Sequence, residues 1–143
     1  MKHLKGKARK RLKRHLLEIK VELYRMTVLV AWEVPLLDVL LHAKDAGCAI
    51  SKKRAGEMIV FAKNCAGLTS HLGDRNTDIV IWLKKRPTDL GTYGALYHEL
   101  FHAVDYITKS HNLDGEIECR AFLMEYLATK CNRYFWAKQK GGR

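Results

Sequence analysis

Two histidines and one glutamate in the segment LYHELFHAVDY, residues 96–106, have types and a spacing that suit chemistry. The pattern His98-Glu99-x-x-His102 places two imidazoles one turn apart on the same face of a helix, so that both can reach one metal ion. Zinc prefers nitrogen and carboxylate ligands, and a catalytic zinc site keeps one position for water. Glu99 is then the candidate general base that takes a proton from this water. The segment therefore predicts a hydrolytic site with one zinc ion per chain.

The third protein ligand has to come from outside this helix. The metzincin class of zinc peptidases has its third ligand six residues after the second histidine, but that position holds Thr108, which excludes the class. A following helix that folds back antiparallel can supply a carboxylate instead. At a rise of about 1.5 Å per residue, Glu118 best reaches the level of His102, so Glu118 is the predicted third ligand. The alternatives that remain open are Glu116, Glu125 and His111.

Other polar residues near the motif are candidates to orient an imidazole or to stabilise an oxyanion. Asp105 follows His98 by seven residues on the same helix face, where it either orients an imidazole through a hydrogen bond or lies at the surface. A tetrahedral oxyanion needs a hydrogen-bond donor, and the sequence does not choose among the nearby candidates. These are Tyr93, Tyr97, Tyr106, His111 and Tyr126.

The elements that must position the motif follow from apolar periodicity. Residues 78–85 (DIVIWLKK) form the clearest strand, and after a short loop a helix is predicted from about Tyr93 to Thr108. A last long helix is predicted from Asp114, a plausible N-cap. The remaining predicted elements are a short helix at Arg11–Glu18, one long or two short strands at 19–32, a helix at 35–47, a strand at Glu57–Asn64 and turns at 66–77. This order predicts an α+β domain.

The two motif-bearing segments resemble a known family. YHELFHAVDYI followed by GEIECRAFLMEYL is similar to gluzincin-type zincins, in particular the small HExxH…ExxA/F proteins of phages and prophages and the ImmA/IrrE-type peptidases. The phage-type pattern makes Glu118 the ligand and Ala121–Phe122 the small–aromatic pair, whereas the other pattern starts at Glu116. The resemblance covers roughly Asp78 to Leu127. It implies a minimal zincin fold with a small twisted, mostly antiparallel sheet, an active-site helix and a C-terminal glutamate-bearing helix. It also implies zinc-dependent hydrolysis of peptide bonds in a protein or peptide substrate.

Composition and charge indicate how many domains the chain has and what its basic segment could bind. With 143 residues, 48% of them hydrophobic, the chain is expected to fold as one domain. Residues 1–14 carry eight Lys or Arg and no acid, so the other residues have a net charge of only 11 − 8 = +3. We therefore expect a basic, disordered arm at 1–14, able to bind nucleic acid or another polyanion, and a single zincin-like domain at 15–143. The four cysteines lack CxxC spacing and are expected to be reduced.

Location and rival functions complete the sequence-based expectations. Residues 26–41 form the longest apolar stretch, which is too short and too charged to span a membrane. The basic start lacks the apolar segment of a signal peptide. A cytoplasmic protein is therefore expected, in the host cytoplasm if a phage encodes it.

One rival function is a non-catalytic binding protein on a zincin scaffold, such as a phage structural or host-interaction factor. The other is a nucleic-acid-associated protein that acts through its basic arm.

Overall fold

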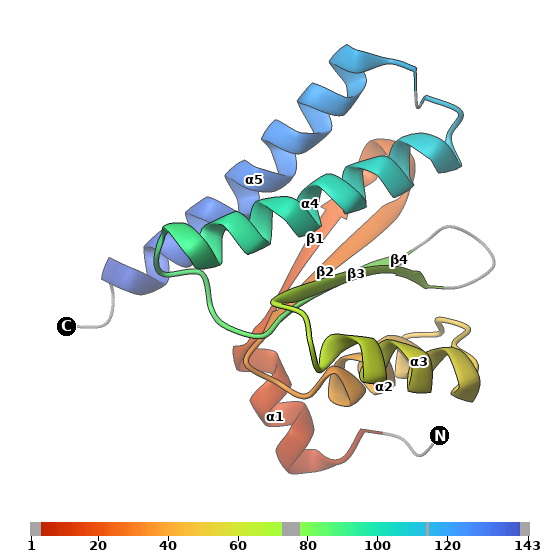
Figure 1. Cartoon of the computed structure of the whole chain (residues 1–143), viewed down its shortest axis with the longest axis vertical. Coiled ribbons are helices and arrows are strands. Elements are labelled where there is room, and N and C mark those ends of the chain that lie inside the picture. Colours follow the sequence, from red (N-terminus) through yellow and green to blue (C-terminus); the bar gives the residue numbers. More distant parts are fainter. Residues whose placement is uncertain (1–3, 73–77, 114, 141–143) are drawn as a thin grey trace.

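The computed structural model describes residues 4–72, 78–113 and 115–140 (Figure 1). Within these ranges one mixed sheet has the strand order β1-β2-β4-β3. Its strands are β1 (Leu16–Val21), β2 (Met26–Trp32), β3 (Gly67–Leu72) and β4 (Asp78–Leu83). β2 and β4 are parallel, while β1 pairs antiparallel with β2 and β3 pairs antiparallel with β4. The predicted mixed α and β content is confirmed, and two of the three strand pairings are antiparallel.

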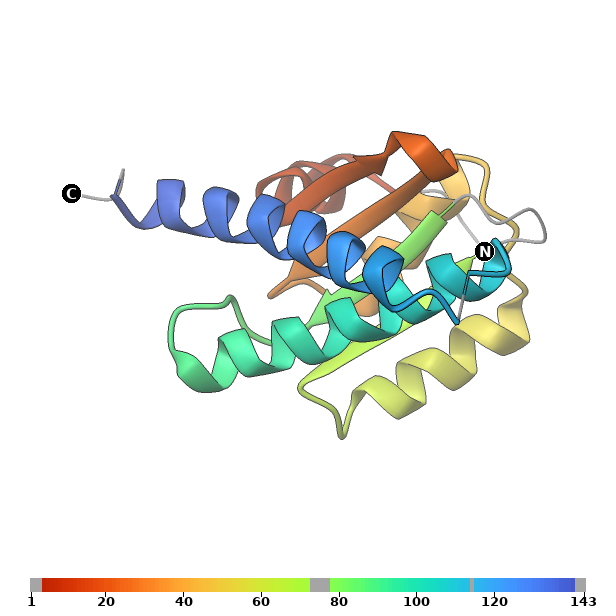
Figure 2. The ribbon, with the colours of Figure 1, turned by 90° about the horizontal axis from the view of Figure 1, so that it is seen from above.

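Helices cover both faces of this sheet, so that the molecule has three layers (Figures 1 and 2). One face is covered by α4 (Leu90–Ser110) and α5 (Ile117–Lys140). The other face is covered by α1 (Gly6–Arg14), α2 (Leu36–Asp45) and α3 (Lys52–Ala62). A short 3-10 helix, η1 (Glu22–Tyr24), joins β1 to β2.

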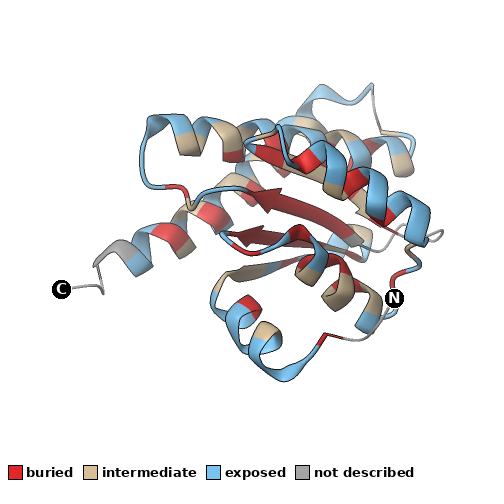
Figure 3. Ribbon diagram, turned by 60° about the horizontal axis from the view of Figure 1, so that its bottom comes forward, coloured by how far each residue is buried: buried red, intermediate tan, exposed pale blue. Residues whose placement is uncertain are grey.

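The alternation of side chains along the central strands produces two hydrophobic cores. In β4, Ile79 and Ile81 pack with α4 and α5, whereas Val80 and Trp82 pack with α1, α2 and α3. A strand that is covered on both faces needs apolar side chains at successive positions, which explains the runs TVLVAW and DIVIWL. Figure 3 shows the resulting buried residues along the strands and on the helix faces that contact them. The motif-bearing helix thus packs along one face of the sheet.

The predicted strand at Glu57–Asn64 is wrong, because most of this segment belongs to helix α3. Ser51 caps the helix by accepting a hydrogen bond from the Arg54 backbone N–H at 3.1 Å. The buried residues Ala55, Met58 and Ala62 follow a helical spacing. Conversely, part of the segment predicted as turns forms strand β3.

The basic segment is folded where the structure describes it. Residues Gly6–Arg14 form helix α1, so the predicted disorder is wrong there, and the helix predicted at Arg11–Glu18 starts and ends earlier. Leu12 is only 1% exposed in the core shared with α2, and the Arg11 guanidinium forms an ion pair with Asp38 at 2.7 Å. The N-cap predicted at Asp114 lies outside the described residues.

Along the described parts of the chain, no helix has both the length and the apolar character needed to cross a lipid bilayer. The cysteines of the chain are free thiols, of which Cys48 and Cys131 are buried. Burial raises the pKa of the Cys131 thiol to about 12, so this thiol stays protonated at neutral pH and is a poor nucleophile.

Candidate metal site

Helix α4 carries the motif, and its start and its buried face fix the orientation of the motif. Asp89 and Thr92 form a reciprocal capping box: the Asp89 carboxylate accepts from the Thr92 backbone N–H, and the Thr92 hydroxyl oxygen accepts from the Asp89 N–H. The hydrogen bond from the Thr92 backbone N–H, followed by the interaction with the Thr92 side chain, holds the pKa of the Asp89 carboxyl below its usual value. The buried residues of α4 that pack on the sheet include Leu96, Leu100, Ala103 and Ile107. The neighbouring face of α4 therefore presents the motif to a pocket.

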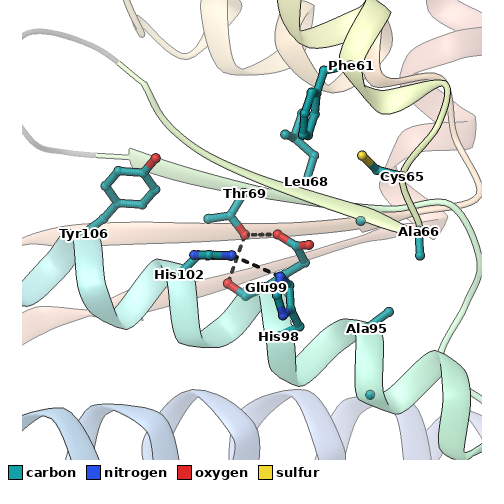
Figure 4. Close-up of a pocket in the computed structure, with 12 residues that line it drawn as sticks. Phe61, Cys65, Ala66, Leu68, Thr69, Ala95, His98, Glu99, His102 and Tyr106 are labelled. Atoms are coloured by element: carbon teal, nitrogen blue, oxygen red, sulfur yellow. Dashed lines mark hydrogen bonds between the residues drawn. The ribbon is translucent and has the colours of Figure 1, made fainter.

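The two imidazoles of the motif converge, as predicted. The Nε2 atoms of His98 and His102 lie 3.1 Å apart, and the ring planes are 84° from each other (Figure 4). Both side chains are exposed to solvent. In a tetrahedral site with Zn–N distances of about 2.05 Å, two nitrogen ligands are about 3.3 Å apart. The observed spacing therefore fits two ligands of one zinc ion.

Glu99 is buried beside the two imidazoles and is held by strand β3. Its side chain is only 6% exposed. The Thr69 hydroxyl lies 2.6 Å from Glu99 Oε2 and 2.9 Å from the Glu99 carbonyl oxygen, so its single proton has two acceptors on the same residue (Figure 4). A carboxylate buried in this way needs such a donor. The hydroxyl fixes the direction of the candidate general base.

Gly67, two residues before Thr69 on the same face of β3, makes room for Glu99. A Cβ atom at Gly67 would lie 2.7 Å from Glu99 Cγ and 3.0 Å from Oε1, closer than nonbonded atoms approach. Neither Gly67 nor Thr69 was predicted from the sequence to belong to the site. Both precede Glu99 by about thirty residues in the sequence, and only the packing of β3 against α4 brings the three together.

A pocket of about 580 Å³ opens over the motif, beside the edge strand β3 and between α3 and α4. Its lining comprises Phe61, Cys65, Ala66, Gly67, Leu68, Thr69, Gly94, Ala95, His98, Glu99, His102 and Tyr106. In Figure 4 the two imidazoles and the Glu99 carboxylate lie near its centre, with Phe61 and Cys65 on the α3 side. Strand β3 is thus the sheet edge at the site, since β4 lies between β2 and β3.

The structure does not gather the predicted third ligand with the two imidazoles. Glu118 and Glu116 are exposed near the start of α5, and the described residues contain no group of three His, Cys, Asp or Glu side chains placed to hold a metal ion. His111 instead contacts the Tyr24 ring, with ring centroids 4.7 Å apart. The third ligand therefore stays a prediction.

Two contacts between α4 and α5 show which part of α5 lies at the level of the motif. The Tyr97 hydroxyl donates to Asn132 Oδ1 at 3.0 Å, and Arg120 donates to Asp105 Oδ1 at 3.2 Å. His102 lies between these levels on α4, so the matching level on α5 falls nearer to Glu125 than to Glu118. The Glu125 side chain lines a hollow with residues such as Phe122, Thr129 and Arg133. Glu118, the ligand predicted from the sequence, therefore lies about two turns too close to the start of α5. Part of this difference arises because α4 ends at Ser110 and α5 begins at Ile117, both later than predicted.

Asp105 connects the two helices in the structure. Its Oδ2 accepts from Lys109 Nζ at 2.7 Å, and its Oδ1 accepts from Arg120. The Lys109 hydrogen bond, followed by the contact with Arg120, holds the pKa of Asp105 below its usual value. These two contacts favour a structural role for this carboxylate over the orientation of an imidazole.

Replacing Asp105 by Asn should lower the free energy of unfolding at pH 7 by at most about 1 kcal/mol, because this ion pair is partly exposed to solvent. A lowered pKa contributes stability above the pKa of the unfolded chain, and this contribution disappears as the pH falls through the folded pKa. Urea unfolding at pH 7 and pH 3 measures this. The difference between variant and wild type should shrink at pH 3, and a difference that grows there would contradict the assignment.

Of the five candidate hydrogen-bond donors to an oxyanion, only Tyr106 lines the pocket. Tyr106 lines the pocket and stacks on the His71 ring with centroids 6.1 Å apart. The other candidates do not line it: Tyr97 donates to Asn132, Tyr126 donates to the Lys20 carbonyl, and the Tyr93 hydroxyl is buried elsewhere. Burial also raises the pKa of Tyr93. Tyr106 is therefore the candidate donor for an oxyanion.

Replacing Thr69 by Val keeps the shape of the side chain but removes the donor to Glu99. In a zinc-dependent hydrolytic site of the kind that the sequence predicts, the rate should fall about 10- to 100-fold, the range typical of residues that orient the reactive groups of a metal site, while zinc affinity changes less. Steady-state kinetics and zinc titration measure the two effects. Ser should restore most of the rate at this position, and a Val variant with wild-type activity would show that the hydroxyl does not orient Glu99.

Comparisons of this chain with protein-family models, with curated proteins and with solved structures found no match.

Proposed function

We propose that this protein is a zinc-dependent peptidase. The observation that carries the proposal is the arrangement of the motif in one pocket. Two imidazole Nε2 atoms lie 3.1 Å apart, and the buried Glu99 carboxylate is held next to them by Thr69. The pocket runs along an open strand edge, where an extended chain can lie.

Each polar residue of the pocket has a separate role in the proposed hydrolysis. His98 and His102 would hold zinc through their neutral Nε2 atoms, and the ion would make water more acidic and polarise the scissile carbonyl. Glu99 accepts a proton from the attacking water and passes it to the leaving amine. Thr69 keeps the carboxylate pointed in one direction. Tyr106, on the pocket wall, is the candidate donor to the developing oxyanion.

The proposed substrate is a peptide in extended conformation, added to the edge of β3. The Lys84 backbone N–H donates to the Ala66 carbonyl at 2.9 Å, which makes these two residues a hydrogen-bonded pair of the β3–β4 ladder. The alternation of an antiparallel ladder then directs the backbone groups of Gly67 and Thr69 away from β4, toward the pocket. Backbone groups at an open edge are what an added strand pairs with.

Side chains of a peptide on this edge would alternate between the α4 side and the α3 side. On the α3 side the pocket wall is formed by Phe61, Cys65 and Leu68, and Phe61 is 61% exposed. An exposed aromatic ring beside a binding groove favours an apolar partner. The proposed peptidase therefore prefers an apolar residue next to the scissile bond.

Replacing Phe61 by Ala should reduce the preference for an apolar side chain at one substrate position. We expect kcat/KM to fall about 10-fold for peptides with Leu or Phe at that position, a loss of about 1.4 kcal/mol of binding, with little change for peptides with Ala. Cleavage of a peptide set varied at single positions measures this. Val60→Ala is the matched control, because Val60 is equally exposed at 63% but does not line the pocket. An equal loss for every peptide would contradict the assignment.

The test of the proposed function combines zinc binding with hydrolysis. Titration of metal-free protein by calorimetry should give about one zinc per chain, and a mixed peptide library should be cleaved only when zinc is present. Glu118→Ala, Glu116→Ala and Glu125→Ala then identify the third ligand as the variant with the largest loss of affinity. Protein that binds no zinc and cleaves nothing would overturn the proposal.

One observation also suits a non-catalytic binding protein. The distance of 3.1 Å between the two Nε2 atoms is that of a hydrogen bond from one neutral imidazole to the other, which needs no metal. In that case the pocket would bind an extended segment without cleaving it. Peptide hydrolysis separates the two functions, because a binding protein would hold an extended peptide without cleaving it, with or without added zinc.

A further inference from the structure

Helix α1 is a fixed part of the fold that presents positive charge outward. Leu12 anchors it in the core, and Arg11 ties it to Asp38 on α2 at 2.7 Å. At 100° per residue, Lys7, Lys10 and Arg14 lie about 140° to 160° around the helix from Leu12, and all three are exposed. None of the three makes an ion pair with another described residue. They form a row of three cations on the outer face of α1.

The C-terminal end of α5 adds another cation next to the end of α1. Lys138 Nζ donates to the Arg14 carbonyl oxygen at 3.3 Å, and the ammonium lies over the rings of Trp32 and Tyr134, 5.8 and 4.7 Å from their centroids. These contacts hold a fourth cation beside the end of α1. We call Lys7, Lys10, Arg14 and Lys138 the basic ridge.

Two acidic residues that contact α1 or the residue after it have partners outside the ridge. Asp38 pairs with Arg11, on another side of α1. Glu33 lies 3.8 Å from His15 Nδ1 and accepts from the Arg86 backbone N–H. The ridge therefore keeps its positive charge.

We propose that the basic ridge binds the phosphate backbone of a nucleic-acid duplex. From Lys7 to Arg14 the row rises about 10.5 Å along the helix, a length over which one strand of duplex DNA carries about three phosphates. Contacts of this kind position a protein on the duplex without reading its sequence. The proposal is independent of the peptidase function.

The composition of α1 favours a nucleic acid over a lipid surface. A helix that lies on a membrane inserts apolar side chains between the lipids. In α1 the buried residue, Leu12, packs against the protein, and the outer face has charged side chains only. An anionic membrane is therefore the competing partner, and the experiment has to distinguish binding to it from binding to a nucleic acid.

The experiment compares two triple variants with the same loss of charge. Lys7→Gln/Lys10→Gln/Arg14→Gln removes the cations of α1, and Lys52→Gln/Lys53→Gln/Lys63→Gln removes three exposed lysines in and next to α3. Binding to a fluorescent 20-base-pair duplex is measured by anisotropy over a series of salt concentrations. The slope of log K against log salt should flatten by about 2.7 for the first variant, since each phosphate contact contributes about 0.9. The control should retain most of the wild-type slope.

The outcomes decide the proposal in both directions. Equal slopes for the two triple variants would mean that net charge alone attracts DNA, and would overturn it. So would a ridge variant that keeps its DNA affinity but no longer binds phosphatidylserine vesicles. Lys138→Gln, which leaves α1 intact, should flatten the slope by about 0.9 and keeps the proposal testable if the triple variant unfolds. Deletion of residues 1–14 is unsuitable, because it would remove Leu12 from the core.

Discussion

Glu99→Gln should reduce peptide hydrolysis by a factor of about 10² to 10⁴, the contribution typical of a general base, while zinc binding stays intact. The amide has nearly the same shape as the carboxylate, so it fits the space beside Gly67 and can still accept the hydrogen bond from Thr69. It has no basic oxygen, however, and cannot take a proton from water. The variant therefore separates the removal of the proton acceptor from the loss of the site.

Three measurements on this variant give a clear result: the rate of hydrolysis, the zinc stoichiometry and the midpoint of thermal unfolding. Glu57→Gln is the matched control, because Glu57 is an exposed glutamate of α3 that does not line the pocket. We expect wild-type values for the control in all three. A Glu99→Gln variant that keeps more than a tenth of the wild-type rate would remove Glu99 from the mechanism.

His98→Ala and His102→Ala should each weaken zinc binding by at least about 100-fold, the upper end of the effect of outer-sphere residues, because each removes a proposed direct ligand. Both side chains are exposed, so truncation leaves no cavity in the core, and thermal stability of the metal-free protein should change little. The two variants should have similar effects, since the motif uses both imidazoles in the same way.

Calorimetric titration with zinc measures the affinity of each histidine variant. His42→Ala is the control, since His42 lies on α2 at the opposite face of the sheet. Circular dichroism checks that each variant is folded. If both motif variants bind zinc as tightly as the wild type, the metal site lies elsewhere and the peptidase proposal fails.

The local parts of the site were predictable, because they depend on spacing within one helix. Four residues separate His98 from His102, and helical geometry alone brings their imidazoles together. The boundaries of α4 were also close to prediction, since its apolar residues recur with helical periodicity. The confirmed fold is mixed α and β, and a zincin fold stays a prediction.

The long-range parts of the site were not predictable from local patterns. Thr69 and Gly67 belong to a segment predicted as turns, and their contact with Glu99 depends on the strand order of the sheet. The apolar run MIVF suggested a strand, but the buried positions Ala55, Met58 and Ala62 stabilise a helix instead. As a result, the wall of the pocket that contains Phe61 was absent from the sequence-based description.

Strand β3 lies so close to α4 at Gly67 that only glycine, whose side chain is a single hydrogen atom, fits beside Glu99. The space that any other amino acid would need at Gly67 is filled by the carbons of Glu99. A scan restricted to polar or ionisable side chains would therefore miss a position where even a substitution by Ala would push the Glu99 side chain away from its observed position. In this protein, enzymatic competence would depend on a residue that has no functional group of its own.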